Sequence, residues 1–215
     1  MLSVKHNKKK NIWIAIVIGI VVVLLLVFAA FKVRHMLINH SYQVRQEQMN
    51  NDTKKREKEI ETQHKEFIQK IGDPAVKIYE KKQQVLPSVV IGQAILESNW
   101  GQSELYKKAN NPFGIKGTYN GQSIYYDTTE YVNNKKTTEV GQFRKYPSVA
   151  DAIEDHNETL NTKFLKKTGI TSFRQEANLL QKNGYATDPD YANKLIGVIV
   201  NHKLMKYDVK AINNY

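Results

Sequence analysis

The sequence predicts a mainly α-helical domain with one β-hairpin, carried behind a single hydrophobic N-terminal segment. Residues 12–31 form an uninterrupted uncharged run. From Phe67 onwards, apolar residues recur at helical spacing between residues that cap helices. Residues 122–143 contain two stretches rich in Tyr, Thr and Val, separated by Asn133-Asn134. A chain of 215 residues has room for one ordinary domain and an appendage.

The hydrophobic run at residues 12–31 is long enough to cross a membrane. Twenty helical residues span about 30 Å, the thickness of the hydrocarbon core of a bilayer. The denser basic cluster precedes the run, which favours a cytoplasmic segment 1–11 and an external chain after residue 31. The alternative is a signal peptide cleaved near Val27-Phe28-Ala29, but this run exceeds the usual length of about 7–15 residues. We therefore expect an uncleaved, single-pass anchor in the cell membrane.

Residues 32–66 are dominated by charged and amide side chains. Opposite charges alternate closely, as in 54–59, which supports a solvated helix. The scattered apolar residues keep no heptad, so a coiled coil is not supported. We expect a polar helical stalk here, with a plain flexible linker as the alternative, and a folded domain over 67–215.

The elements of the domain follow from capping and turn residues. Asp73-Pro74 is expected to cap and begin a new helix, because proline suits the first helical position. Further helices or helical turns are predicted over 88–101 with Ser88 as N-cap, 103–108, 148–160, 172–183 and from Asp188-Pro189 to beyond Leu204. The strands are predicted over 122–132 and 135–143.

The helix at 87–101 carries the first candidate catalytic group. Val89 to Leu96 is apolar on most of its circumference, as in a helix buried inside a fold. Glu97 lies in the last turn, where burial and the negative end of the helix dipole would both raise its pKa. A carboxyl group that stays protonated near neutral pH suits general acid catalysis. The pattern alone leaves open whether Glu97 simply points into water.

A second carboxylate, Glu130, lies in the predicted hairpin. Hairpin acids commonly pair with neighbouring lysines in solvent, but this strand also carries Tyr125, Tyr126 and Tyr131, whose rings suit stacking on sugars. An acid on a helix that faces an acid on a hairpin is a workable glycosidase arrangement.

Other chemistries have little support. Cysteine is absent, so disulfides and thiolate chemistry are excluded. His156 has no partner at metal-ligand spacing, so we predict no metal and no cofactor. No Gly-x-Ser-x-Gly elbow is present. The net charge of +11 comes without a nucleic-acid-binding motif, so we expect no nucleic-acid partner.

Five motifs in order resemble the bacterial N-acetylglucosaminidases of glycoside hydrolase family 73. They are PSVVIGQAILESNWG (87–101), NNPFGIKG (110–117), YYDTTEYV (125–132), FRKYPS (143–148) and GYATDPDYANKL (184–195). The resemblance implies a lysozyme-like fold and cleavage of the glycan strands of peptidoglycan after N-acetylglucosamine. It implies that Glu97 is the general acid, that Glu130 is the hairpin acid, and that Tyr185 or Tyr191 is an active-site tyrosine. It also implies substrate-binding positions at Asn111, Phe113, Gly114 and Tyr131.

Three alternatives stay open at this point. The domain could cleave another bond of the same polymer, as a muramidase or lytic transglycosylase. It could be a catalytically silent wall-binding scaffold, tethered to a membrane-protein partner through residues 12–31. It could also bind nucleic acid through charge alone.

Overall fold

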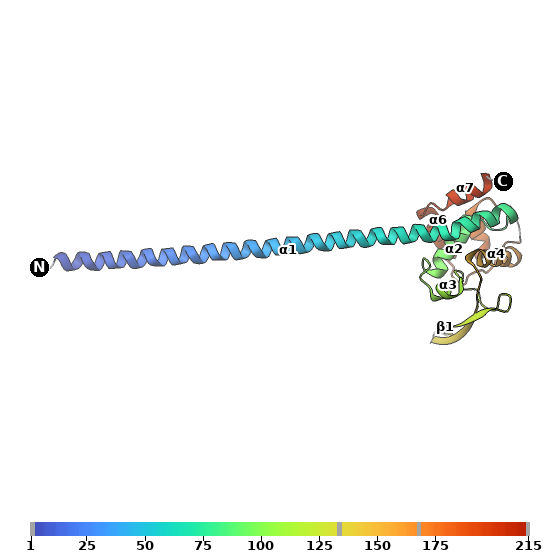
Figure 1. The fold of residues 1–215 in the computed structure, drawn as a ribbon, viewed down its shortest axis with the longest axis horizontal. Coiled ribbons are helices and arrows are strands. Elements are labelled where there is room, and N and C mark those ends of the chain that lie inside the picture. Colours follow the sequence, from blue (N-terminus) through green and yellow to red (C-terminus); the bar gives the residue numbers. More distant parts are fainter. Residues whose placement is uncertain (1–2, 133–134, 167–168, 214–215) are drawn as a thin grey trace. The chain divides into compact units, whose positions relative to one another are not determined.

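The computed structural model describes residues 3–132, 135–166 and 169–213, and the side chains of residues 12–127 and 140–213 within these ranges (Figure 1). The elements are α1 (Ser3–Lys82), α2 (Pro87–Ser98), α3 (Glu104–Ala109), β1 (Ser123–Val132), β2 (Lys135–Arg144), α4 (Val149–Thr159), the π-helix η1 (Leu160–Leu165), α5 (Phe173–Lys182), α6 (Tyr191–Asn201) and α7 (Met205–Asn213). Most of the chain is helical, and β1 and β2 form one antiparallel sheet. This confirms the predicted fold class.

The chain divides into two compact units, residues 1–60 and residues 61–215. In the first unit, the apolar side chains from Ile12 to Phe31 are exposed along α1. Within the described ranges, α1 is the one helix long and apolar enough to cross a membrane. A signal sequence near an N-terminus meets the same criterion, so the membrane anchor stays a proposal.

The predicted helix start at Asp73-Pro74 is wrong, because α1 continues through Pro74 to Lys82. Proline has no N–H for the carbonyl four residues earlier, and an interior proline usually breaks a helix. Here, Ile71, Ala75 and Tyr79 share one buried face on either side of the proline. Burial of this face stabilises the helical path despite the missing hydrogen bond.

Helix α2 lies at the centre of the second unit, as its apolar pattern predicts. Every residue from Pro87 to Ile95 is buried, and α2 packs against α5, α6 and α7. A Cβ atom at Gly92 would lie 2.7 Å from Leu195 Cδ1, so the absent side chain lets α2 and α6 approach closely. Protein atoms therefore surround the first two turns of α2, the helix that carries Glu97.

The N-terminus of α2 is capped by side chains far along the chain, so the predicted Ser88 N-cap is wrong. Leu86 is the N-cap residue and makes no side-chain capping bond. The Leu86 N–H donates to both Glu176 carboxylate oxygens of α5, at 3.3 and 3.2 Å. The N–H and hydroxyl of Ser88 donate to the two oxygens of Asp208 in α7, at 2.7 and 2.6 Å. These carboxylates satisfy N–H groups that the first turn of a helix leaves unpaired.

We expect Asp208→Asn to stabilise the domain at pH 8 and to change little at pH 4. Burial raises the pKa of Asp208 to about 6 from an ordinary 3.8, although its bonds to Ser88 lower it. Between pH 4 and pH 6, Asp208 is largely protonated in the folded state but ionised in the unfolded state. The free energy of unfolding therefore falls as pH rises from about 4 to about 6. A shift of this size corresponds to about 3 kcal/mol. In the asparagine variant, Oδ1 can still accept the Ser88 N–H and Nδ2 can donate to the Ser88 hydroxyl oxygen, so both contacts can form without an ionised group.

Urea midpoints at pH 4 and pH 8 measure this effect. Asp127→Asn, at an exposed position in β1, is the control and should leave the difference between the two midpoints as in the wild type. An Asp208→Asn protein whose midpoint still falls as steeply as that of the wild type contradicts the prediction. Burial also raises the pKa of Glu176, so a smaller pH dependence is expected to remain.

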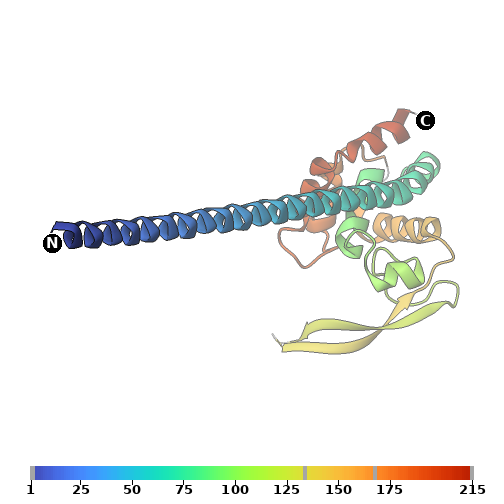
Figure 2. The same cartoon turned by 60° about the vertical axis from the view of Figure 1, so that its left-hand side comes forward.

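The predicted caps Ser148 and Ser172 and both predicted strands are confirmed, and Ser103 is a further cap. The Ser103, Ser148 and Ser172 hydroxyls accept N–H groups at the starts of α3, α4 and α5. The two strands run within one residue of their predicted limits, and Figure 2 shows them as a long ribbon extending from the helices of this unit. The hairpin turn at 133–134 lies outside the described residues.

The predicted final helix is wrong at both ends. It begins at Tyr191 with Asp190 as N-cap and not at Asp188-Pro189, and it ends at Asn201, with α7 following as a separate helix. Lys203 at the break has a positive φ of 53°, which ends the helical path. The buried side chain of Leu204 lies in this turn, and Asp208 of α7 then reaches Ser88.

Candidate active site

Glu97 occupies the last turn of α2, and the chain turns sharply immediately after it. Asn99, Trp100 and Gly101 all have positive φ, at 47°, 59° and 73°. The Ser98 hydroxyl closes the turn, because it accepts the Gly101 N–H at 2.8 Å and donates to the Ala94 carbonyl at 2.5 Å. This turn fixes where the helix ends and therefore where the Glu97 carboxyl lies.

The Glu97 residue is solvent-accessible, yet enough protein surrounds its carboxyl for burial to raise its pKa. Both observations fit a group that water or a ligand can reach from one side while protein atoms surround the others. A carboxyl with a raised pKa keeps its proton closer to neutral pH, which general acid catalysis requires.

Tyr185 and Tyr191 lie beside Glu97. Their ring centroids are 5.3 Å apart with the planes tilted by 47°, and Phe164 packs edge-on against Tyr185 at 5.3 Å. Burial is the main cause that raises the pKa of each tyrosine, and the charge of Glu97 raises both further. Both hydroxyls therefore keep their protons at neutral pH. The structure brings these three predicted site residues together.

Gln93 belongs to the same cluster, although the motif analysis did not single it out. It lies one turn before Glu97 on α2 and is fully buried. Its Nε2 donates to the Tyr191 hydroxyl oxygen at 2.7 Å. The available signal was one amide side chain in the otherwise apolar stretch 89–96, four residues before the candidate acid.

Glu130 and Tyr131 lie in β1, where their backbones pair with Thr137 and Lys136 of β2. Their side chains lie outside the described part of the structure, so their predicted roles rest on strand position alone. The described part of β1 packs against helix α3.

Asn111, Phe113 and Gly114 lie in the loop that joins α3 to the hairpin. The Asn111 side chain is buried, and its hydrogen bonds go to backbone groups. Its Nδ2 donates to the Ile115 and Arg144 carbonyls, and its Oδ1 accepts the Ile115 N–H, all at 3.0 Å. Phe113 is buried and stacks on His156 with centroids 3.8 Å apart. Gly114 has a φ of +64° with open space where a Cβ would lie. Of these three residues, Gly114 is the most accessible to a ligand.

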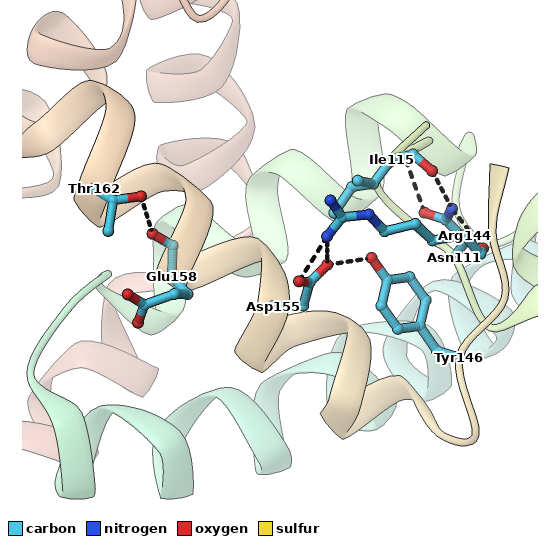
Figure 3. Close-up of polar contacts among 7 residues, drawn as sticks. All are labelled: Asn111, Ile115, Arg144, Tyr146, Asp155, Glu158 and Thr162. Atoms are coloured by element: carbon cyan, nitrogen blue, oxygen red, sulfur yellow. Dashed lines mark hydrogen bonds and ion pairs between the residues drawn. The ribbon is translucent and has the colours of Figure 1, made fainter. Parts of the chain in front are cut away.

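A polar network holds the base of the hairpin to α4 (Figure 3). Arg144 at the end of β2 donates through Nη1 to both oxygens of Asp155, at 2.6 and 2.5 Å. The Tyr146 hydroxyl donates to the same carboxylate at 2.5 Å. Together with the Asn111 contacts, these bonds tie the root of the hairpin to the helices.

His156 is buried, and burial lowers its pKa to about 4, so the imidazole is neutral at physiological pH. In the described parts of the chain, no three His, Asp or Glu side chains come close enough to hold a metal ion. Among the described side chains, the site offers the chemistry of one accessible carboxyl and two neutral phenols.

Comparisons with known proteins show which family the chain resembles in sequence and fold. Residues 73–204 match the family profile described as mannosyl-glycoprotein endo-beta-N-acetylglucosaminidase. The exo-glucosaminidase LytG of Bacillus subtilis is 41% identical over 149 residues, which is 66% of this chain and 52% of LytG. A probable N-acetylmuramidase of Lactococcus lactis is 36% identical over 156 residues, 66% of this chain and 34% of that protein. The matched part of this chain thus spans about half the length of LytG and about a third of the length of the Lactococcus lactis protein.

A solved structure shares the fold. The catalytic domain of the autolysin Auto from Listeria monocytogenes superimposes with a TM-score of 0.62 at 38% identity, covering 68% of this chain and 88% of that domain. The family match over residues 73–204 includes α2 and the hairpin.

Proposed function

The chain belongs to the glucosaminidase family of glycoside hydrolases, and from this premise we propose that it cleaves the β-1,4 bond after N-acetylglucosamine in the glycan strands of peptidoglycan. The observation that carries the proposal is the cluster at the end of α2. It places an accessible carboxyl of raised pKa, Glu97, beside the two neutral hydroxyls of Tyr185 and Tyr191. This combination supplies a proton and hydrogen-bond donors without a metal or cofactor.

Glu97 acts as the general acid. Its proton passes to the glycosidic oxygen as the bond from that oxygen to the anomeric carbon breaks. The substrate's own 2-acetamido carbonyl oxygen attacks the anomeric carbon, and water then opens the resulting ring and returns a proton to Glu97. A tyrosine hydroxyl, or Glu130, stabilises the cationic intermediate or assists the water. The raised pKa of Glu97 extends its acid form to higher pH, and activity falls once pH rises through that pKa.

The location that fits this substrate is the outer face of the cell membrane. Residues 12–31 anchor the chain with residues 1–11 in the cytoplasm, residues 32–66 form the stalk, and residues 67–215 hold the catalytic domain. The exposed apolar surface of α1 in this segment supports the anchor, and it also offers a contact for a membrane-protein partner.

Analysis of the reducing ends after borohydride reduction tests which bond is cleaved. Purified peptidoglycan is digested with the wild type, and the new ends are identified by mass spectrometry. Reduced N-acetylglucosamine ends are expected. The name of the Lactococcus lactis relative makes an N-acetylmuramidase the second candidate, which would give reduced N-acetylmuramic acid ends. Anhydro ends would indicate a lytic transglycosylase, and the absence of new ends would indicate a scaffold.

Glu130→Gln is expected to lower the turnover number about tenfold, less than loss of a general acid would. Glu130 lies in a two-stranded sheet, and the hydrogen bonds to α4 given for its described side chains are at its root, so an essential nucleophile held rigidly is not expected there. Glu139→Gln on β2 is the matched control, with an unchanged turnover number expected. A loss as large as that of a Glu97 variant would instead indicate two essential carboxylates.

A further inference from the structure

Gln93 is a polar side chain in a place where apolar packing would serve the fold. It is fully buried in α2, between the apolar residues Ile91 and Ile95 of the same helix. Among the described residues its Oε1 has no hydrogen-bond partner. A buried polar atom without a partner destabilises the folded state, because it has lost its bonds to water and gained none. Methionine, of similar length and without polar atoms, would avoid this loss.

The one hydrogen bond that Gln93 makes leads to the site. Its Nε2 donates to Tyr191, which is buried and lies beside Tyr185. Tyr191 and Tyr185 both interact electrostatically with Glu97. Residues 93 and 97 are also separated by four positions, which places them on the same side of the helix.

The direction of this bond determines what the Tyr191 hydroxyl can do. A phenol has one proton to donate and can accept hydrogen bonds on the same oxygen. When the amide N–H of Gln93 fills an accepting position, the Tyr191 proton must point to another acceptor. Besides Gln93, the described side chains that influence the pKa of Tyr191 are Tyr185 and Glu97, and a substrate bound next to them would be a further acceptor.

We propose that Gln93 is a positioning residue for glycan cleavage, which acts through Tyr191 and holds its hydroxyl as a donor toward the reacting centre beside Glu97. This inference rests on the proposed function. It assigns Gln93 no contact with substrate. It explains why an unpaired amide oxygen is tolerated in the core, since buried polar groups that weaken a fold are found at functional sites.

Gln93→Met is the direct test, made in the full-length chain in detergent with soluble, uncross-linked glycan strands as substrate. We expect the turnover number to fall about tenfold, KM to stay within about twofold, and the melting temperature to stay the same or rise. A merely structural residue would show the opposite, a lower melting temperature with an unchanged turnover number per folded molecule. Ile91→Met is the matched control, because residue 91 is equally buried but lies about 200° around the helix.

A double variant tests whether Gln93 affects catalysis by orienting the Tyr191 hydroxyl. Tyr191→Phe removes the hydroxyl that Gln93 orients, so Gln93→Met should cause no further loss in the Tyr191→Phe background. Independent, multiplying losses would show that Gln93 does not act through Tyr191 and would overturn the inference.

Gln93→Glu adds a readout that depends on pH. A protonated glutamic acid has nearly the shape of glutamine and can donate to Tyr191, whereas its ionised form can only accept. The variant should therefore be most active relative to the wild type at pH 5, and this ratio should fall once pH rises through the pKa of the new carboxyl, which burial raises. A ratio that rises toward pH 8, or a Gln93→Glu protein no more active at pH 5 than Gln93→Met, contradicts the inference.

The outcomes separate this inference from the proposed function. A wild type that cleaves no glycan contradicts both. An active wild type with an equally active Gln93→Met protein contradicts the role of Gln93 alone. If neither Gln93→Met nor Gln93→Glu folds, Gln93 is required for the structure and the inference is wrong.

Discussion

Glu97→Gln is expected to lower the turnover number on purified peptidoglycan about a thousand-fold, with the fold unchanged. Glutamine has the same shape but no proton acidic enough to transfer to the leaving oxygen, and a positioned general acid contributes about 10²–10⁴-fold to a rate. Because Glu97 is solvent-accessible and makes none of the bonds that close the end of α2, its replacement should leave that turn intact. The measurements are the rate of release of reducing ends and the circular dichroism spectrum.

Glu104→Gln is the matched control for the loss of one carboxylate. Glu104 lies in the neighbouring helix α3 and forms an exposed ion pair with Lys108 at 2.8 Å. Its replacement should leave the rate within about twofold, because exposed ion pairs contribute little to stability. Turnover by Glu97→Gln within tenfold of the wild type would remove Glu97 from the mechanism.

Gly101→Ala is expected to lower the free energy of unfolding by about 3–5 kcal/mol. Gly101 has a φ of +73°, a conformation that alanine adopts only with strain. An added Cβ would also lie 2.7 Å from two atoms of the Phe67 ring and 2.9 Å from the Tyr106 ring. These rings pack edge-on against each other with centroids 5.5 Å apart, so neither can move away freely. Urea denaturation followed by circular dichroism measures the loss.

Gly121→Ala separates the effect of backbone strain at a positive φ from the effect of the clash with the two rings. Gly121 has a similar φ of +76°, but no atom lies within 4 Å of the position of its Cβ. This variant should lose only the conformational part, about 1–2 kcal/mol. Equal losses for the two variants would show that the close approach to Phe67 and Tyr106 contributes nothing.

Local sequence signals predicted most of the fold. The serine caps at 148 and 172 and the two strands depend on neighbouring residues, and each was found where the sequence placed it. The apolar circumference of 89–96 predicted a buried helix, and α2 is buried.

The errors arose where distant contacts override local preference. Ser88 has the identity of an N-cap, but its hydroxyl bonds to Asp208, 120 residues away. Proline at 74 has the identity of a helix start, but the buried face of α1 continues past it. Neither the bond from Ser88 to Asp208 nor the burial of α1 around Pro74 can be predicted from neighbouring residues alone.

In the candidate site too, residues marked by local sequence were predicted, and a residue whose role depends on a distant contact was not. The sequence placed Glu97 at a helix end, and the motif 184–195 named two tyrosines that the structure brings to it. Gln93 was missed because its importance depends on a bond to Tyr191, 98 residues further along the chain. The predicted roles of Glu130 and Tyr131 stay predictions, since the structure does not describe their side chains.

The capping of α2 by Glu176 and Asp208 has a consequence for how the protein is made. Protein synthesis proceeds from the N-terminus, so the active-site helix emerges from the ribosome long before the two carboxylates that complete its first turn. Contacts between residues 90 and 120 positions apart form late in folding. A chain that has not yet been extended to Asp208 therefore lacks the carboxylate that pairs with Ser88, and the first turn of α2 stays incomplete until that residue has been added.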